Sequence, residues 1–177
     1  RAKDLLRAHP GRNTVPLIYS CHFQHGFVEW PKDRLRKPNA LALGPQSDDL
    51  LVPSGHYVLV KRFSAKEERR RVVAAVYDPA RVQDGRVAFE NHLNYYHLRG
   101  AGLPITVAKG LTAFLNSTLV DSYFRQFSGH TQVNATDLRS LRYPTWEKLV
   151  MLGRRIGTSF PAQDELDHLV EEVALRG

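Results

Sequence analysis

The spacing of apolar residues changes near Gly100, and this change constrains the fold more than any other feature of the chain. Before it, short runs rich in β-branched and aromatic residues alternate with turn residues, which is typical of strands. After it, from residue 107 to residue 127, apolar residues recur at intervals of three and four, which is typical of helices. We therefore expect an α+β protein, with a β-rich part at residues 12–100 and a helical part at residues 105–160.

We expect the β-rich part to form a mainly antiparallel, curved sheet. Its clearest strands are residues 55–63 and 71–77, and the short basic connection between them predicts a hairpin. Ser64 and Glu67 have the spacing of a capping box, which predicts one helical turn within that connection. Further strand regions are predicted at residues 15–23 and 87–98.

The helical pattern is interrupted at Asn116, Ser117 and Thr118, so we expect two helices within residues 107–127. Pro144 and Pro161 each precede another segment with helical spacing, and proline is well tolerated at the start of a helix. Further helices are therefore predicted at residues 137–141, 145–156 and 164–175.

The length of 177 residues is that of a single domain with a sizeable core. We expect this domain at residues 1–160, followed by an acidic helix at residues 161–177. Because the first residue is Arg1 rather than methionine, we also expect the chain to be a piece of a longer polypeptide. No run approaches the roughly 20 apolar residues of a membrane span, and one cysteine fits a reducing compartment, so we expect a cytoplasmic protein without a membrane partner.

The formal net charge of +7 is unevenly distributed. Residues 1–100 carry 17 Lys and Arg against 10 Asp and Glu, whereas residues 101–177 carry 8 of each. From Pro161 onward the chain is acidic. A basic excess in one half of a protein favours binding to a phosphate backbone, and a solvated basic face is the alternative.

The residues that could perform catalysis do not form a recognisable motif. Lys61 lies on a strand suited to a divalent-metal nuclease, but Leu59 occupies the position of the second carboxylate. A nucleotide-binding glycine loop and a serine nucleophile motif are both missing from the sequence. Two histidine-containing clusters are too compact for a structural zinc site or a metal nuclease, so we expect strand packing instead; they are Cys21-His22 with His25, and His92 with Asn94 and His97. We expect no catalytic, cofactor-binding or metal-ligating residue in this chain.

The basic hairpin connection is the first candidate binding site. Lysine and arginine neutralise phosphates, and arginine also forms bidentate contacts with guanine. The alternative is a solvated loop whose arginines pair with Glu67 and Glu68. The predicted DNA-binding residues are Lys61, Arg62, Lys66, Arg69, Arg70 and Arg71.

A polar segment at residues 129–134 is the second candidate. Its side chains can form hydrogen bonds with bases or phosphates. The alternative is a capping loop in which Asn134 or Thr136 begins the turn that holds Asp137. The DNA-binding candidates here are His130, Thr131, Gln132 and Asn134.

Both candidate segments belong to a longer pattern that resembles a known family. The first part is Gly55-x-Tyr-Val-Leu-Val-Lys-Arg-Phe-Ser, followed by the basic run at residues 66–71. The second part runs from Phe114-Leu-Asn-Ser to the Gly129-His-Thr-Gln-Val-Asn segment and ends on Tyr143-Pro144. Across residues 12–150 the chain resembles the C-terminal part of adenine-N6 DNA methyltransferases of bacterial restriction-modification systems.

This resemblance implies a target recognition domain that grips double-stranded DNA and reads its sequence. In that family an N-terminal Rossmann-like domain binds S-adenosylmethionine and carries an Asn-Pro-Pro-Tyr type motif for the flipped adenine. The chain has neither that motif nor a cofactor-binding glycine motif, so both are expected N-terminal to Arg1. The implied partners are duplex DNA, the methyltransferase domain of the same protein, and an endonuclease domain or subunit.

Two other functions stay open on the sequence. The first is a metal-dependent nuclease or DNA-repair domain, which would need two carboxylates near Lys61. The second is an interaction module in which the acidic segment from Asp164 onward docks onto a basic partner.

Overall fold

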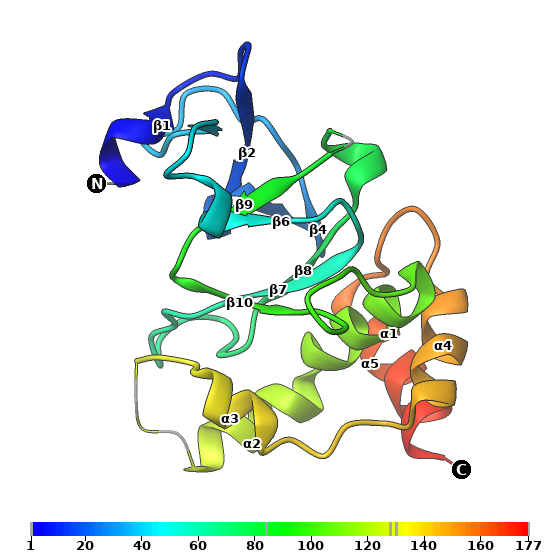
Figure 1. Cartoon of the computed structure of the whole chain (residues 1–177). Helices are drawn as coiled ribbons and strands as arrows, with labels where there is room; N and C mark the ends of the chain where they lie inside the picture. The colour runs from blue at the N-terminus through cyan, green and yellow to red at the C-terminus, as the bar shows by residue number, and fades with distance from the viewer. Residues whose placement is uncertain (1, 84, 128, 130, 177) are drawn as a thin grey trace.

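The computed structural model describes residues 2–83, 85–127, 129 and 131–176, and it confirms the expected α+β class (Figure 1). The described strands form two sheets, and the second sheet lies between the first sheet and the helices (Figure 1). No helix among the described residues is long and apolar enough to cross a membrane.

The first sheet contains one parallel pair, β2 with β9, among antiparallel neighbours. It buries a small apolar cluster that includes Val15, Leu17, Leu41 and Ala88. In spatial order its strands are β1 (Leu6–Arg7), β5 (Ala40–Ala42), β2 (Thr14–Ile18), β9 (Val87–Phe89) and β6 (Leu51–Val52).

The second sheet contains the predicted hairpin, which is confirmed. Its two strands pair in antiparallel register from Tyr57 opposite Tyr77 to Val60 opposite Ala74. A parallel pair joins β4 to β8. In spatial order the strands are β10 (Leu93–Tyr96), β7 (Tyr57–Lys61), β8 (Ala74–Tyr77), β4 (Phe27–Val28) and β3 (Phe23–Gln24).

Strand β7 is covered on both faces, which explains its uninterrupted apolar sequence. Tyr57 and Leu59 pack into a cluster shared with the first sheet. Val58 and Val60 point the other way, into the cluster that the helices cover. Because alternate side chains of a strand point to opposite faces, a strand buried on both sides needs apolar residues at every position.

Three expectations about the β-rich part were wrong in detail. The expected single sheet is two sheets within the described residues, although each is mainly antiparallel as predicted and has one parallel pair. The strand predicted at residues 87–98 is divided between the sheets because the chain turns after Glu90, whose carbonyl accepts the Leu93 N–H. The strand predicted at residues 15–23 ends at Ile18, and a short 3-10 helix, Ser20–His22, follows.

The helical turn predicted at Ser64 and Glu67 is also absent from the described hairpin loop (residues 62–73). The Glu68 carboxylate accepts the Ala65 N–H instead, and the chain forms turns and bends there. The Glu68 carboxylate, one residue after the expected capping position at Glu67, therefore binds the Ala65 N–H without starting a helix.

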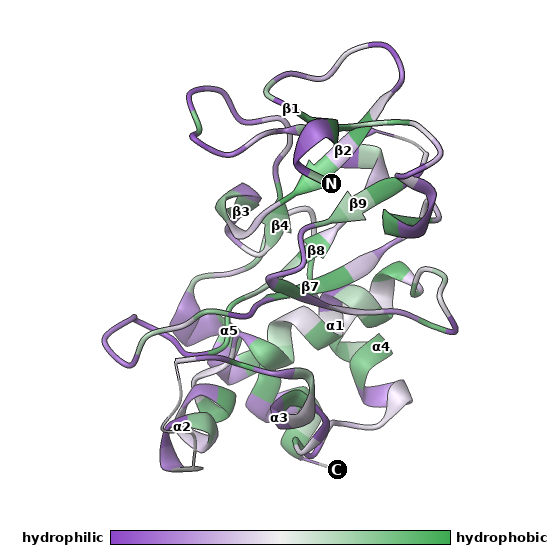
Figure 2. Ribbon diagram, turned by 60° about the vertical axis from the view of Figure 1, so that its left-hand side comes forward, coloured by the Kyte–Doolittle hydropathy of each residue, from purple (hydrophilic) through white to green (hydrophobic). Residues whose placement is uncertain are grey.

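The predicted interruption near Asn116 is confirmed, since this residue ends one helix and the next begins at Thr118. The helical layer covers the second sheet, with α1 beside β7 and β8 (Figure 2), and buried apolar residues of these three elements share one core cluster. Its helices are α1 (Ile105–Leu115), α2 (Thr118–Phe127), α3 (Ala135–Arg139), α4 (Trp146–Arg154) and α5 (Gln163–Val170), which a π-helical turn (Glu171–Leu175) continues.

Helices α1 and α4 approach closely because each carries a glycine at the contact. A Cβ on Gly153 would lie 1.7 Å from the carbonyl oxygen of Thr106, and one on Gly110 would lie 2.0 Å from that of Leu149. Helix α5 joins the same core through Leu166, which is 4% exposed. The acidic C-terminal helix is therefore packed into the helical layer.

Candidate nucleic-acid interface

The fold brings the two candidate binding segments side by side. The Ser64 N–H donates to the carbonyl oxygen of Thr131 at 2.8 Å, and the Val133 N–H donates to that of Arg62 at 2.7 Å. Phe63 and Gln132 form an antiparallel bridge between these two bonds. The segment at residues 131–133 thus continues the second sheet beside the chain that leaves β7, and the two segments form one surface.

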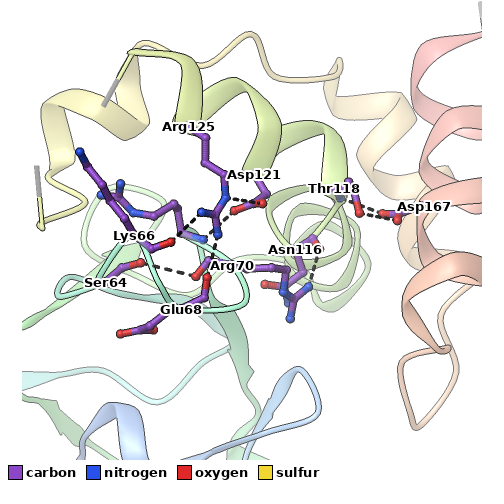
Figure 3. Close-up of polar contacts among 10 residues, drawn as sticks. Ser64, Lys66, Glu68, Arg70, Asn116, Thr118, Asp121, Arg125 and Asp167 are labelled. Atoms are coloured by element: carbon purple, nitrogen blue, oxygen red, sulfur yellow. Dashed lines mark hydrogen bonds and ion pairs between the residues drawn. The ribbon is translucent and has the colours of Figure 1, made fainter. Parts of the chain in front are cut away.

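The hairpin loop is held against α2 rather than standing free in solvent (Figure 3). The Arg125 guanidinium donates to the carbonyl oxygens of Lys66 and Glu68, both at 2.8 Å. The Asp121 carboxylate accepts the Arg71 N–H at 2.7 Å and the Arg125 Nε–H at 2.9 Å. Hydrogen bonds that involve a charged group are the stronger ones, so these contacts fix the path of the loop.

A second set of contacts joins the loop to the junction between α1 and α2. The Arg70 guanidinium donates to the carbonyl oxygen of Asn116 (Figure 3) and to the Gln163 side chain of α5. The Gln163 amide also donates to the Asn116 carbonyl oxygen, at 3.0 Å. Arg70 therefore connects the hairpin loop with the end of α1 and with α5.

The predicted basic residues have three different environments. Lys66 and Arg69 are exposed, and Arg62 is half-buried. Arg71 is 1% exposed, and Arg70 is half-buried with its guanidinium bound internally. In this conformation Lys66, Arg69 and Arg62 can reach a polyanion, whereas Arg70 and Arg71 hold the loop in place.

Lys61 is engaged by Glu68, its ion-pair partner at 2.9 Å. Partial burial by itself would raise the pKa of the Glu68 carboxyl, but hydrogen bonds from Lys61 and from the Ala65 N–H hold this pKa below its ordinary value. Glu68 is therefore charged at neutral pH. The sequence alternative paired the arginines of the loop with Glu67 and Glu68, but among the described ion pairs Glu68 binds Lys61 instead.

The residues of the polar segment also have different environments. Thr131 is exposed and Gln132 is half-buried beside Phe63. Asn134 is the N-cap of α3 in a capping box with Asp137, whose carboxylate accepts the Asn134 N–H at 2.8 Å. Asn134 thus has the capping role that the sequence left as the alternative, and His130 lies outside the described residues.

An exposed aromatic pair, Phe63 and His92, is not among the residues that the sequence predicted for DNA binding. The Phe63 side chain is 44% exposed, and its ring centroid lies 5.0 Å from that of His92. The His92 ring is held by Glu90, with 2.5 Å between Nδ1 and the carboxylate. The available signal was an apolar residue placed directly after two cations at the end of a buried strand.

The histidine clusters form hydrogen bonds that belong to the fold. No group of three or more His, Cys, Asp or Glu side chains in the described part of the chain could hold a metal ion. His22 is buried, accepts the Tyr19 N–H at Nδ1 and lies 2.8 Å from the Asn39 side chain through Nε2. His97 accepts the Gly100 N–H, and Asn94 donates to the Val133 carbonyl oxygen. Asn94 thus also supports the segment at residues 131–133.

Comparison with known proteins identifies two relatives. "Type II methyltransferase M.PstI" from Providencia stuartii is 48% identical over 172 residues, and "Type II methyltransferase M.BsuBI" from Bacillus subtilis is 49% identical over 177 residues. The chain is homologous to part of type II methyltransferases. The matches cover 97% and 99% of the chain but only 34% and 35% of the two methyltransferases, so it spans about a third of their length.

Two further comparisons gave no match. No protein-family model matches the chain, and no solved structure matches it. The similarity to type II methyltransferases therefore rests on the two full-length relatives, and it extends over both segments of the candidate interface.

Proposed function

We propose that the chain is the DNA recognition part of an adenine-N6 methyltransferase of a restriction-modification system. The convergence of the hairpin loop and the segment at residues 131–133 on one surface carries this proposal. Two segments far apart in sequence, each with side chains suited to nucleic acid, form a single strip through main-chain hydrogen bonds. The type II methyltransferase relatives support the proposal over nearly the whole chain.

The chemistry of the strip suits duplex DNA. Lys66 and Arg69 would neutralise phosphates, which fixes the position of the protein on the duplex. Arg62 and Gln132 would contact base edges, because arginine matches guanine and glutamine matches adenine in the major groove. Phe63 between them provides an apolar contact for a base or a thymine methyl group.

The rigid support of the strip favours a specific contact over a loose electrostatic one. Arg125, Asp121 and Arg70 hold the loop through bonds to its main chain and to its neighbours. A binding loop that is ordered before it meets its ligand loses less conformational entropy on binding. The exposed cations are therefore presented from a fixed backbone.

We place S-adenosylmethionine binding and methyl transfer in the portion of the relatives that this chain does not span. The chain would hold the duplex so that this portion captures a flipped adenine. An endonuclease domain or subunit belongs to the same proposal, and its test requires the longer protein.

Selection from a pool of duplexes with a randomised centre tests the recognition function directly. We expect the chain to enrich one short sequence and to bind it more weakly as the salt concentration rises. Recovery of an unenriched pool, or binding that does not respond to salt, would contradict the proposal. In the longer protein, methylation of the enriched site should appear on adenine, and methylation of cytosine would refute the adenine assignment alone.

A further inference from the structure

A second basic surface lies outside the proposed strip, on the loop of residues 32–38 (the 32–38 loop). Its four cations in six residues are accompanied by one carboxylate, Asp33. Arg34, Arg36 and Lys37 are exposed, and no ion pair joins them to a carboxylate within the described part of the chain. The fourth cation, Lys32, is used internally and donates to the Cys21 carbonyl oxygen at 3.1 Å.

The side chain of Asn39 closes this loop. It is 4% exposed, and its Nδ2 donates to the Lys32 carbonyl oxygen at 2.9 Å and to that of Ala8 at 3.1 Å. Its Oδ1 accepts the Lys32 N–H at 3.2 Å and lies 2.8 Å from Nε2 of His22. One buried amide thus binds the start of the loop, the residue that follows β1 and the 3-10 helix that ends at His22.

The main chain of Asn39 adds a second set of bonds. Its carbonyl oxygen accepts the Trp30 indole N–H at 2.6 Å and the Leu17 N–H at 3.0 Å, and its N–H donates to the Arg7 carbonyl oxygen at 3.1 Å. Both ends of the loop are therefore tied to the first sheet. The cations between them are presented from an ordered base.

Arg34 adopts a backbone conformation that an arginine reaches only at a steric cost. Its φ is 61°, in the left-handed region that glycine and asparagine occupy more readily. Such positions cluster at binding sites, and in this chain one also occurs at Arg99 in a turn, so the exposed charges carry the argument. Guanidinium groups bind phosphate through paired hydrogen bonds, so a phosphate backbone is the ligand that fits.

We propose that Arg34, Arg36 and Lys37 form a second DNA-binding element, which contacts the phosphate backbone of the duplex and not its bases. This inference rests on the proposed function, because it takes duplex DNA as the ligand. Lys37 also lies 5.5 Å from the centre of the Tyr19 ring, which restrains its side chain. The two arginines are thus the residues to test.

Salt-titrated binding to a fixed duplex of the enriched sequence separates this element from the strip. In the double variant Arg34→Ala/Arg36→Ala, the slope of log affinity against log salt should become less steep by about 2, since each lost phosphate contact removes about 0.9. Arg34→Lys/Arg36→Lys keeps both charges and should restore the slope. The discrimination between enriched and random duplex should stay unchanged in both variants.

A matched control removes two exposed cations elsewhere, in Arg154→Ala/Arg176→Ala. We expect its slope to stay close to that of the unaltered chain. If the loop variant and this control have the same slope, the second element is refuted while the proposed function stands. If the unaltered chain itself fails to bind the duplex, the proposed function fails, and the second element fails with it.

Discussion

The side-chain amide of Asn116 forms two hydrogen bonds with the main chain of Ala74. Its Oδ1 accepts the Ala74 N–H at 2.8 Å, and its Nδ2 donates to the Ala74 carbonyl oxygen at 2.9 Å. Asn116 ends α1, whereas Ala74 begins β8 directly after the hairpin loop. One buried amide therefore sets the position of the helical layer relative to the hairpin that carries the candidate interface.

Replacing Asn116 with alanine should destabilise the protein by about 3 kcal/mol. The substitution removes both bonds and leaves two main-chain groups of Ala74 buried without a partner, each at a cost of about 1–3 kcal/mol. Urea unfolding followed by circular dichroism measures the change. The control Asn91→Ala alters an exposed asparagine and should stay within about 0.5 kcal/mol of the unaltered chain. Equal losses in the two variants would show that the buried amide has no special role.

Replacing Gly153 with alanine should separate α1 from α4. The added Cβ would lie 1.7 Å from the Thr106 carbonyl oxygen, and a backbone atom cannot move aside as a flexible side chain can. We expect a loss of about 1–3 kcal/mol, the usual cost of overpacking, although alanine is the better helix former. Gly157→Ala adds the same group in open space and serves as the control. A Gly153→Ala variant with an unchanged melting temperature would contradict the close approach of the helices.

Removing the exposed cations of the hairpin loop should change the salt dependence of DNA binding. In Lys66→Ala/Arg69→Ala the slope of log affinity against log salt should become less steep by about 2. Fluorescence anisotropy with a labelled duplex measures this slope. The stability should change little because both side chains are exposed. A slope equal to that of the unaltered chain would remove these two residues from the phosphate-binding set.

Replacing Phe63 with alanine should weaken DNA binding without altering its salt dependence. An apolar contact with a base releases no counterion, so the affinity should fall about tenfold while the slope of the salt plot is preserved. Leu98→Ala removes another apolar side chain of similar exposure, 48% against 44%, and should leave DNA affinity unchanged. Unaltered affinity in Phe63→Ala would place the aromatic pair outside the contact with DNA.

The stability should decrease as the pH falls below about 6.5 because His22 is buried in its neutral form. Burial lowers the pKa of His22 from its ordinary value of 6.5, and the Tyr19 N–H occupies Nδ1. Below pH 6.5 the unfolded chain binds a proton at His22 that the folded protein does not bind. The contribution of neutral His22 to the free energy of unfolding is therefore complete above pH 6.5 and is lost below it.

Urea unfolding between about pH 8 and about pH 5 tests this linkage. The difference in unfolding free energy between the unaltered chain and His22→Gln should shrink below pH 6.5, by at most about 1.4 kcal/mol per pH unit. Taking the difference cancels the titration of the other histidines. A difference that is constant with pH would show that His22 titrates normally in the folded protein.

Local patterns predicted much of the secondary structure. The hairpin of β7 and β8 followed from two apolar runs with a short connection, and the break at Asn116 followed from three polar residues within a helical repeat. These features depend on neighbours in sequence, so a single chain reveals them. The division of residues 87–98 between two sheets depends on packing against distant strands, and no local pattern indicated it.

The candidate interface also combines features that the sequence predicts with features that depend on distant packing. The sequence alone determined the α+β class, the concentration of positive charge in residues 1–100, and the two polar segments with side chains suited to DNA. Only the tertiary structure decided that residues 62–64 pair with residues 131–133, that Arg71 is buried, and that Phe63 is exposed. The physical reason is that charge and periodicity are properties of the chain itself, whereas burial and pairing depend on which distant segments the core brings into contact.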